Sequence, residues 1–433
     1  MRAETRAKRN RVSSRGPWVL LSLALLLAGF AIGQEWPRPL ATPTRAIMPT
    51  AAVMATPVAV FSEAWSLLHE HYVDLAALDN QRLLAGALRG LADAVGDDGH
   101  TRYLTAEELT QHSEQLSGEY SGVGIEISKQ DNTIVVRDVF ANSPAARAGI
   151  QPGDVLVAVD GIPVSELGLD GVVQRVRGPE GTVVALMIQQ VGKASPLEVR
   201  LVRSKVRLSG VRWAVLPERV GLLRVSSFAA GTAEDAWQGL SELAAAGARG
   251  VILDLRGNPG GLVNQAVDVA GLFLPPDTVV LRSRDRSGKE TVYRTKPDAQ
   301  PVTLPLVVLV NRETASAAEI VAGALQDHRR AIIIGERTFG TGTVLAEFRL
   351  RDGSALLIGT QVWVTPNGRV IWRNGIEPDI TVAPAAEDVT IVPRRGEILP
   401  AEQIRSDSQL LAAWEYLLER DRACRSGEGE GCP

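Results

Sequence analysis

The sequence has few cysteines and histidines, and it lacks a strongly basic surface. Its 433 residues include two cysteines, five histidines and six lysines, and the formal net charge is -4. Cys424 and Cys432 lie in a tail rich in glycine and glutamate, where they could close a small loop in an oxidising environment or stay free. A lone pair of cysteines does not indicate a metal site. We therefore expect no metal, no cofactor and no nucleic-acid partner.

Positive charge is concentrated in the first fifteen residues, which contain six basic side chains and one acid. Residues 17–33 follow without a charge, and their number matches the shortest helices that cross a bilayer. We expect residues 1–33 to be a basic flank followed by a membrane anchor or a cleaved signal peptide, with the remainder outside the cytoplasm in the cell envelope. The anchor is favoured because the cleavage signature is weak and the charged region is long. Residues 34–56, rich in proline, threonine and alanine, are predicted to be a linker.

Apolar periodicity predicts a small helical unit over residues 57–116. Phe61, Trp65 and Leu68 recur at three- and four-residue steps, which is typical of one face of a helix. A polar turn around His100 interrupts this pattern. Since no partner lies nearby at a spacing typical of ligands or catalytic pairs, His100 is predicted to have a structural role in the turn.

Residues 117–204 change to short β-like runs punctuated by glycine. The string SPAARAGIQPGDVLVAVDG, from Ser143 to Gly161, lies within them. On this string the segment resembles a PDZ domain, which implies that the partners are protein or peptide C-termini. Glycines let successive backbone amides converge on a terminal carboxylate, and the next strand offers an open edge to an extended peptide. The carboxylate-binding loop of a PDZ domain corresponds here to Gly122, Val123, Gly124 and Ile125.

From residue 205 to residue 421, strands alternate with helices, which predicts an α/β domain, and residues 422–433 are expected to be a flexible tail. An apolar run at 306–310 precedes Ser316, which begins a predicted helix. Unpaired amides and the positive end of the helix dipole beside its hydroxyl suit a developing oxyanion. Serine is also an ordinary helix cap, so this position alone does not establish a catalytic role.

Several segments around this serine form a larger pattern. They are Asp254–Gly261 (DLRGNPGG), the helix that begins at Ser316, Gly335–Gly342 (GERTFGTG), Thr365–Arg369 (TPNGR) and Gly375–Asp379 (GIEPD). With the preceding units, from about Phe61 to Arg420, the chain resembles the C-terminal processing (tail-specific) serine peptidases. The resemblance implies an α/β fold: a crotonase-like peptidase core with a small N-terminal helical unit and an inserted β-rich PDZ domain.

The same resemblance implies roles for individual residues. Ser316 matches the nucleophile, and the amides of the oxyanion hole correspond to Gly260, Gly261 and Ala317. In this family the base is a lysine in a Gly-Lys-Gly turn, supported by a glutamine four residues later. Those two positions are occupied here by Thr341 and Leu345. A threonine hydroxyl cannot take up a proton near neutral pH, whereas a desolvated lysine can.

Two functions remain open after this comparison. The first is a membrane-tethered protein that holds C-terminal tails, alone or beside an active family relative, with weak or absent proteolysis. The second is an active serine endopeptidase that combines Ser316 with a relocated base. The paired replacement of the lysine and the glutamine favours the first, and the retained serine supports the second. The residues considered for a relocated base, each more typical of a surface or capping role, are Lys289, Lys296 and His328.

Overall fold

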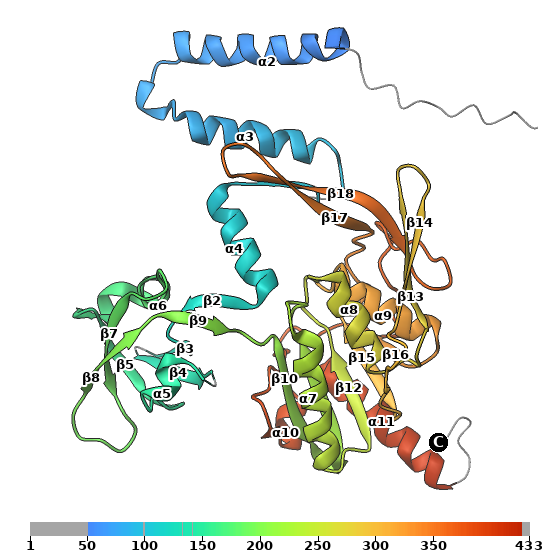
Figure 1. Ribbon diagram of the computed structural model, residues 1–433. Coiled ribbons are helices and arrows are strands. Elements are labelled where there is room, and N and C mark those ends of the chain that lie inside the picture. Colours follow the sequence, from blue (N-terminus) through green and yellow to red (C-terminus); the bar gives the residue numbers. More distant parts are fainter. Residues whose placement is uncertain (1–50, 98–99, 132, 141, 427–433) are drawn as a thin grey trace, which may run out of the picture. The chain divides into compact units, whose positions relative to one another are not determined.

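The protein is described by a computed structural model that covers residues 51–97, 100–131, 133–140 and 142–426 (Figure 1). The chain forms two compact units, Met1–Asn80 and Gln81–Pro433. The predicted anchor at residues 17–33, most of the predicted linker and Cys432 lie outside the described residues. Within the described part, no helix is both long and apolar enough to cross a membrane.

The described part of the first unit is helical. α2 (Ala51–His71) is followed by the short helix η1 (Leu75–Ala77), whose N-cap, Asp74, accepts a hydrogen bond from the backbone of Ala76 at 3.0 Å. The remainder of the predicted helical unit, α3 (Asn80–Asp93) and α4 (Ala106–Ser117), falls almost entirely in the second unit.

An antiparallel five-stranded sheet forms one part of the second unit. Its strands are β1 (Arg102–Leu104), β18 (Ala355–Val364), β13 (Val279–Asp285), β14 (Glu290–Arg294) and β17 (Thr343–Arg349). Helix α4 begins with a capping box between Thr105 and Glu108 and ends at Gly118, whose left-handed conformation terminates it. A small apolar cluster joins α4 to this sheet through Leu104, Leu109, Ala355 and Leu357.

The predicted PDZ domain lies between two paired strands, β2 (Glu119–Gly122) and β9 (Ser204–Arg207). Its six-stranded sheet has the order β3-β4-β5-β7-β8, with β6 paired to β5. Because β3 stands at the end of this order, its outer edge is unpaired within the sheet. The elements are β3 (Ile125–Gln130), β4 (Thr133–Val139), α5 (Pro144–Arg147), β5 (Val155–Val159), β6 (Ile162–Pro163), α6 (Val164–Val176), β7 (Val183–Gln189) and β8 (Leu197–Val202).

A seven-stranded sheet forms the α/β core, in the order β19-β16-β15-β12-β11-β10-β20. Strands β11, β12, β15 and β16 are parallel, and β10 is antiparallel to β11. The strands are β10 (Val211–Leu216), β11 (Val220–Val225), β12 (Gly250–Asp254), β15 (Leu306–Val310), β16 (Ile332–Gly335), β19 (Ile380–Thr381) and β20 (Glu397–Ile398), with the short helix η2 (Pro217–Arg219) between β10 and β11.

Helices cover both faces of this sheet (Figure 1). Every residue of β12 and β15 is buried, as expected for central parallel strands with both faces covered. One face packs against α7 (Thr232–Ala245), α8 (Val263–Gly271) and α9 (Ala317–Asp327), and the other packs against α10 (Ala401–Ile404) and α11 (Ser408–Ser426). The predicted α/β class is therefore confirmed.

The parallel topology brings three segments that contain or adjoin candidate site residues to one edge of the sheet. The chain after β12 runs through 255–261, the chain after β15 leads to Ser316, and the chain after β16 forms the turn before Thr343. Since ligands bind outside the carboxyl ends of parallel strands, we expect a binding or catalytic site at this edge.

Candidate active site and peptide groove

Ser316 lies at the start of α9 in a strained backbone conformation. Its φ of 51° and ψ of -117° belong to a region that residues with a side chain rarely adopt. The backbone N–H of Ser316 donates to Glu319 Oε2 at 2.9 Å. A Cβ added at Gly260 would lie only 2.7 Å from the Cβ of Ser316. Glycine is therefore required at position 260 for the two backbones to approach this closely.

The segment 258–261 runs beside the start of α9 and supplies amide donors. Ala315 N donates to the carbonyl of Asn258 at 2.9 Å, and Gly260 N donates to Asn258 Oδ1 at 2.8 Å. No acceptor among the described residues takes a hydrogen bond from Gly261 N or from Ala317 N. Of the three amides predicted for an oxyanion hole, those of Gly261 and Ala317 remain available in this conformation, while that of Gly260 is engaged.

Glu319 connects the serine helix to the turn that follows β16. Its side chain is fully buried and accepts four hydrogen bonds, which come from Ser316 N, Thr338 Oγ1, Gly340 N and Thr341 N at 2.5–2.9 Å. Burial raises the pKa of Glu319, and the four hydrogen bonds oppose that rise. One oxygen, Oε2, accepts both the Ser316 and the Thr341 amides, so the nucleophile position and the base position belong to one hydrogen-bonded unit.

Thr341 occupies a closely packed turn. The residue is 7% exposed, and its carbonyl accepts a hydrogen bond from Trp363 Nε1 at 2.9 Å. A Cβ added at Gly342 would lie 2.2 Å from the Cβ of Trp372. The backbone of the Gly-Thr-Gly turn is thus held in place by its neighbours even though the side chain between the two glycines carries no base.

Leu345 belongs to an apolar environment. It is partly buried and packs against the cluster formed by Leu104, Leu109, Ala355 and Leu357. A register shift between Val344 and Leu345 interrupts the pairing of β17 with β18 at this point. The position predicted for a supporting glutamine therefore contributes to packing between β17, β1 and α4.

His100 contacts β17, which sequence reasoning did not predict. Its Nδ1 lies 2.5 Å from Thr343 Oγ1, two residues beyond Thr341. Burial lowers the pKa of His100 to about 4, so the imidazole is neutral at pH 7; Asp97 opposes this shift and Arg102 adds to it. Asp97 also accepts the backbone N–H of Thr101 at 2.9 Å, which fixes the turn.

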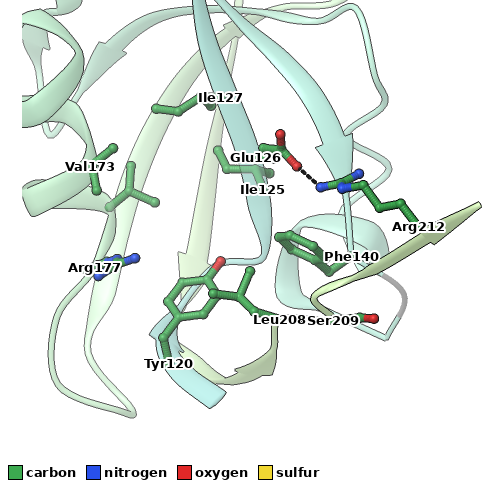
Figure 2. Close-up of a pocket in the computed structure, with 11 residues that line it drawn as sticks. Tyr120, Ile125, Glu126, Ile127, Phe140, Val173, Arg177, Leu208, Ser209 and Arg212 are labelled. Atoms are coloured by element: carbon green, nitrogen blue, oxygen red, sulfur yellow. Dashed lines mark hydrogen bonds and ion pairs between the residues drawn. The ribbon is translucent and has the colours of Figure 1, made fainter. Parts of the chain in front are cut away.

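A groove of about 310 Å³ lies in the predicted PDZ domain, between β3 and α6 (Figure 2). Its walls are mainly apolar, and Figure 2 shows that Tyr120 and Leu208 lie at one end. The predicted carboxylate-binding loop borders this end. Gly124 has a φ of 84°, and a Cβ there would lie 2.1 Å from the Cβ of Ser143, so only glycine fits. The residues that line the groove are Tyr120, Ile125, Glu126, Ile127, Phe140, Val173, Val176, Arg177, Leu208, Ser209 and Arg212.

Part of the groove wall comes from outside the predicted PDZ segment. Leu208 and Ser209 lie between β9 and β10, and Arg212 lies on β10 of the α/β core. The Arg212 guanidinium forms an ion pair with Glu126 on β3 and a second, at 3.5 Å, with Asp138 on β4 (Figure 2 shows the first). Arg212 therefore links the core sheet to the strand that would receive a peptide.

Comparison with known proteins identifies the family. The sequence profile of peptidase family S41 matches residues 219–382, and that of the PDZ domain matches residues 135–190. A carboxyl-terminal-processing protease from Synechocystis sp. is 38% identical over 324 residues, which cover 73% of this chain and 75% of the relative. The chain belongs to the carboxyl-terminal-processing proteases of family S41.

A second relative agrees with this assignment, and one solved structure has a similar fold. A carboxy-terminal-processing protease from Bartonella bacilliformis is 35% identical over 329 residues, which cover 75% of each chain. A crystal structure assigned to an S41 protease from Bacteroides fragilis matches 82% of this chain and 96% of its own, with a TM-score of 0.50 and 17% identity. The last similarity concerns the fold alone. The predicted membership of the C-terminal processing peptidases is thus confirmed.

The structure of this carboxyl-terminal-processing protease brings some predicted site residues together and separates others. Ser316, Gly260 and Ala317 meet at the carboxyl edge of the sheet, and Glu319 joins Thr341 to them. His328, one of the residues considered for a relocated base, lies at the opposite end of α9, about 18 Å along the helix from Ser316. Its Nε2 lies 2.8 Å from the carbonyl oxygen of Val279.

The two lysines considered for a relocated base belong to other parts of the structure. Lys296 forms an ion pair with Asp268 at 3.0 Å and lines a separate groove beside α7 and α8. Lys289 lies between β13 and β14, where its backbone donates to Asp285 Oδ1 at 3.0 Å. Within the described residues, no group of three or more potential metal ligands of the types His, Cys, Asp and Glu is present.

Proposed function

We propose that this protein captures unstructured C-terminal tails of proteins in its PDZ groove, and that its own hydrolysis of peptide bonds is weak or absent. One observation carries the second part of the proposal. The backbone of the active site is assembled around Ser316 and Glu319, but the residue held at the base position is Thr341. General-base assistance contributes about a hundredfold to ten-thousandfold to such reactions. A hydroxyl at this position does not supply it.

The groove supports the first part of the proposal. It combines an unpaired strand edge on β3, a glycine-containing loop at one end and apolar walls, which are the features that β-strand addition of a peptide requires. We further propose that residues 17–33 anchor the protein, with the globular part of the chain that follows them in the cell envelope outside the cytoplasm. An active relative would then be a natural partner, to which captured tails are presented.

The experiment that tests this proposal separates binding from cleavage. The full chain is incubated with an unfolded protein that has an apolar C-terminus, and the Ser316→Ala variant is treated in parallel. We expect both proteins to retain the substrate in a pull-down and neither to release fragments above background. Fragments that depend on Ser316 would overturn the proposed lack of hydrolysis, and failure of both proteins to retain the substrate would overturn the proposed capture.

A second candidate function is an active serine endopeptidase in which His100 replaces the lysine. It is favoured by the 2.5 Å contact of His100 Nδ1 with Thr343, because a tautomer that donates from Nδ1 leaves a lone pair on Nε2. The low pKa of His100 argues against it, since an effective base has a pKa near the working pH. Cleavage that depends on Ser316 and is abolished by His100→Asn would establish this candidate.

A further inference from the structure

A second groove, of about 450 Å³, lies on the α/β core. We call it the α7/α8 groove, because it is lined by α7, by α8 and by the loop of residues 296–300 (Figure 1 labels both helices). None of the residues that line it also lines the peptide groove between β3 and α6. It is therefore a candidate binding site that the proposed capture of C-terminal tails does not use.

Hydrogen bonds hold the walls of the α7/α8 groove in place. Gln265 Oε1 on α8 accepts the backbone N–H of Ala233 on α7 at 3.1 Å, which joins the two helices. The loop of residues 296–300 is fastened just after its end, where Val302 N donates to the carbonyl of Leu272 at 2.8 Å. The groove is thus formed before a ligand binds, and less conformational freedom is lost on binding.

An exposed tryptophan, Trp237, lines the α7/α8 groove. Ala236 and Leu240 of the same helix pack into the core, whereas Trp237 is 46% exposed. Two other tryptophans of this chain, Trp213 and Trp372, each have an arginine over the ring, with the guanidinium carbon 5.2 Å from the ring centre. Among the described residues, no arginine or lysine lies over the Trp237 ring in this way. Its π face is thus available to a cation from another molecule.

The α7/α8 groove also has an excess of negative charge. Three carboxylates line it, those of Glu234, Asp268 and Asp298, against one ammonium group, that of Lys296. Lys296 pairs with Asp268 at 3.0 Å, and the ion pair of Glu234 with Arg207 is longer, at 3.7 Å. Within the described part of the chain, no basic side chain lies within 4.0 Å of the Asp298 carboxylate. The groove therefore attracts a positively charged group.

We propose that the α7/α8 groove binds an arginine side chain of a partner protein, with the guanidinium over Trp237 and its N–H groups donating to Asp298. Arginine fits better than lysine, because its planar guanidinium stacks on an aromatic ring, donates in a fork to a carboxylate and is less strongly hydrated. A neutral ligand such as a sugar would also stack on the indole, but it would gain nothing from the excess of carboxylates. Charge complementarity therefore selects a cationic occupant.

The test measures peptide affinity in the full chain carrying Ser316→Ala, which prevents cleavage. The probe is a fluorescein-labelled peptide with two internal arginines and an amidated C-terminus, so it has no terminal carboxylate for the peptide groove. In the matched probe both arginines are replaced by citrulline, which keeps the shape and removes the charge. We expect the arginine peptide to bind about tenfold more tightly by fluorescence anisotropy, and the difference to shrink as sodium chloride is added.

Substitutions in the groove then locate the binding. Trp237→Leu, which removes the π face and keeps an apolar side chain, and Asp298→Asn are each expected to weaken binding of the arginine peptide about threefold to tenfold. Lys296→Gln is expected to tighten it about threefold, because Asp268 then lacks its cation. Since this last variant is expected to gain affinity, a loss of folding does not imitate the result.

Matched control substitutions lie outside the groove. Phe61→Leu replaces an aromatic ring that is also 46% exposed, and Asp93→Asn replaces an exposed carboxylate at the end of α3. Neither is expected to change the affinity for the arginine peptide. Weakening by these controls equal to that in Trp237→Leu and Asp298→Asn would show that binding is not specific to the groove.

Other results would also overturn the proposal. Equal affinity for the arginine and citrulline peptides would show that charge does not select the ligand, and an unchanged affinity in both Trp237→Leu and Asp298→Asn would place the binding elsewhere. If the arginine peptide does not bind, while a chitin tetrasaccharide binds the parent chain and not Trp237→Leu, the groove is a sugar site. Because neither peptide has a terminal carboxylate, failure of this proposal leaves tail capture standing, and failure of tail capture leaves this proposal standing.

Discussion

The backbone N–H of Thr341 donates to Glu319 Oε2 at 2.8 Å, inside the α/β core. The same oxygen accepts the N–H of Ser316, so one carboxylate oxygen joins Ser316 to Thr341, which stands where the family resemblance implies a lysine. This arrangement agrees with our proposal that the protein binds C-terminal tails with little or no cleavage, although it retains a serine in a strained conformation. The fold depends on Glu319 independently of the chemistry, because four buried donors converge on its carboxylate.

Replacement of Glu319 by glutamine should destabilise the core. The side-chain NH₂ group of glutamine would face donors that now bind a carboxylate oxygen, and each unsatisfied buried donor costs about 1–3 kcal/mol. We expect the free energy of unfolding, measured by urea denaturation, to fall by about 2–5 kcal/mol. Glu313→Gln, an exposed substitution in the loop before α9, should change it by less than about 0.5 kcal/mol. Equal stability of the two variants would show that the Glu319 hydrogen bonds do not hold the turn.

A side chain at Gly260 should disturb the start of α9. Its φ is 101°, and the added Cβ would lie 2.7 Å from that of Ser316, so the serine or the loop must move. We expect Gly260→Ala to lower the free energy of unfolding by about 1–3 kcal/mol. The matched substitution is Gly86→Ala in α3, where no atom lies within 4 Å of the new Cβ and where alanine favours the helix. If Gly260→Ala leaves the free energy of unfolding unchanged, the loop and the helix do not approach as closely as described.

His100 should make stability depend on pH. Its pKa is about 4 in the folded protein against 6.5 for the free side chain, so between these values the unfolded state binds the additional proton. Stability contributed by the neutral imidazole is therefore present above pH 6.5 and is lost as the pH falls toward 4.

The His100→Asn variant tests this contribution while keeping a polar atom near Thr343. Its urea midpoint should fall less than that of the parent chain between pH 7 and pH 5, because asparagine does not titrate in this range. His71→Asn, whose side chain is exposed in the first unit, should retain the full pH dependence. Identical pH dependence in the parent chain and His100→Asn would contradict the lowered pKa of His100.

Local sequence patterns predicted the α/β class of the core, whereas Ser316 and Gly260 were named as site residues only by the family resemblance. In the structure the apolar run 306–310 forms β15, and Ser316 lies beside Gly260 because parallel strands bring their carboxyl ends together. Strand β11 ends at Val225, and Phe228 beyond it makes only an isolated bridge with Gly261.

Contacts between distant segments could not be predicted in this way. His100 meets Thr343 across 243 residues, and Arg212 meets Glu126 across 86 residues, with no periodicity or motif to relate them. The role of Glu319 was also missed, although it stands three residues after the serine, since its four donors come partly from a separate turn. Leu345, at the position where the resemblance implies a glutamine, packs in an apolar cluster.

The most direct test of the central claim restores the missing base. Thr341→Lys combined with Leu345→Gln is compared with the parent chain in cleavage of an unfolded protein with an apolar C-terminus, and each is paired with its own Ser316→Ala variant; circular dichroism confirms that all four are folded. We predict that the double variant gains Ser316-dependent cleavage at least about a hundredfold above the parent chain. Ser316-dependent cleavage by the parent chain at the same rate would contradict the claim that the base at position 341 limits hydrolysis.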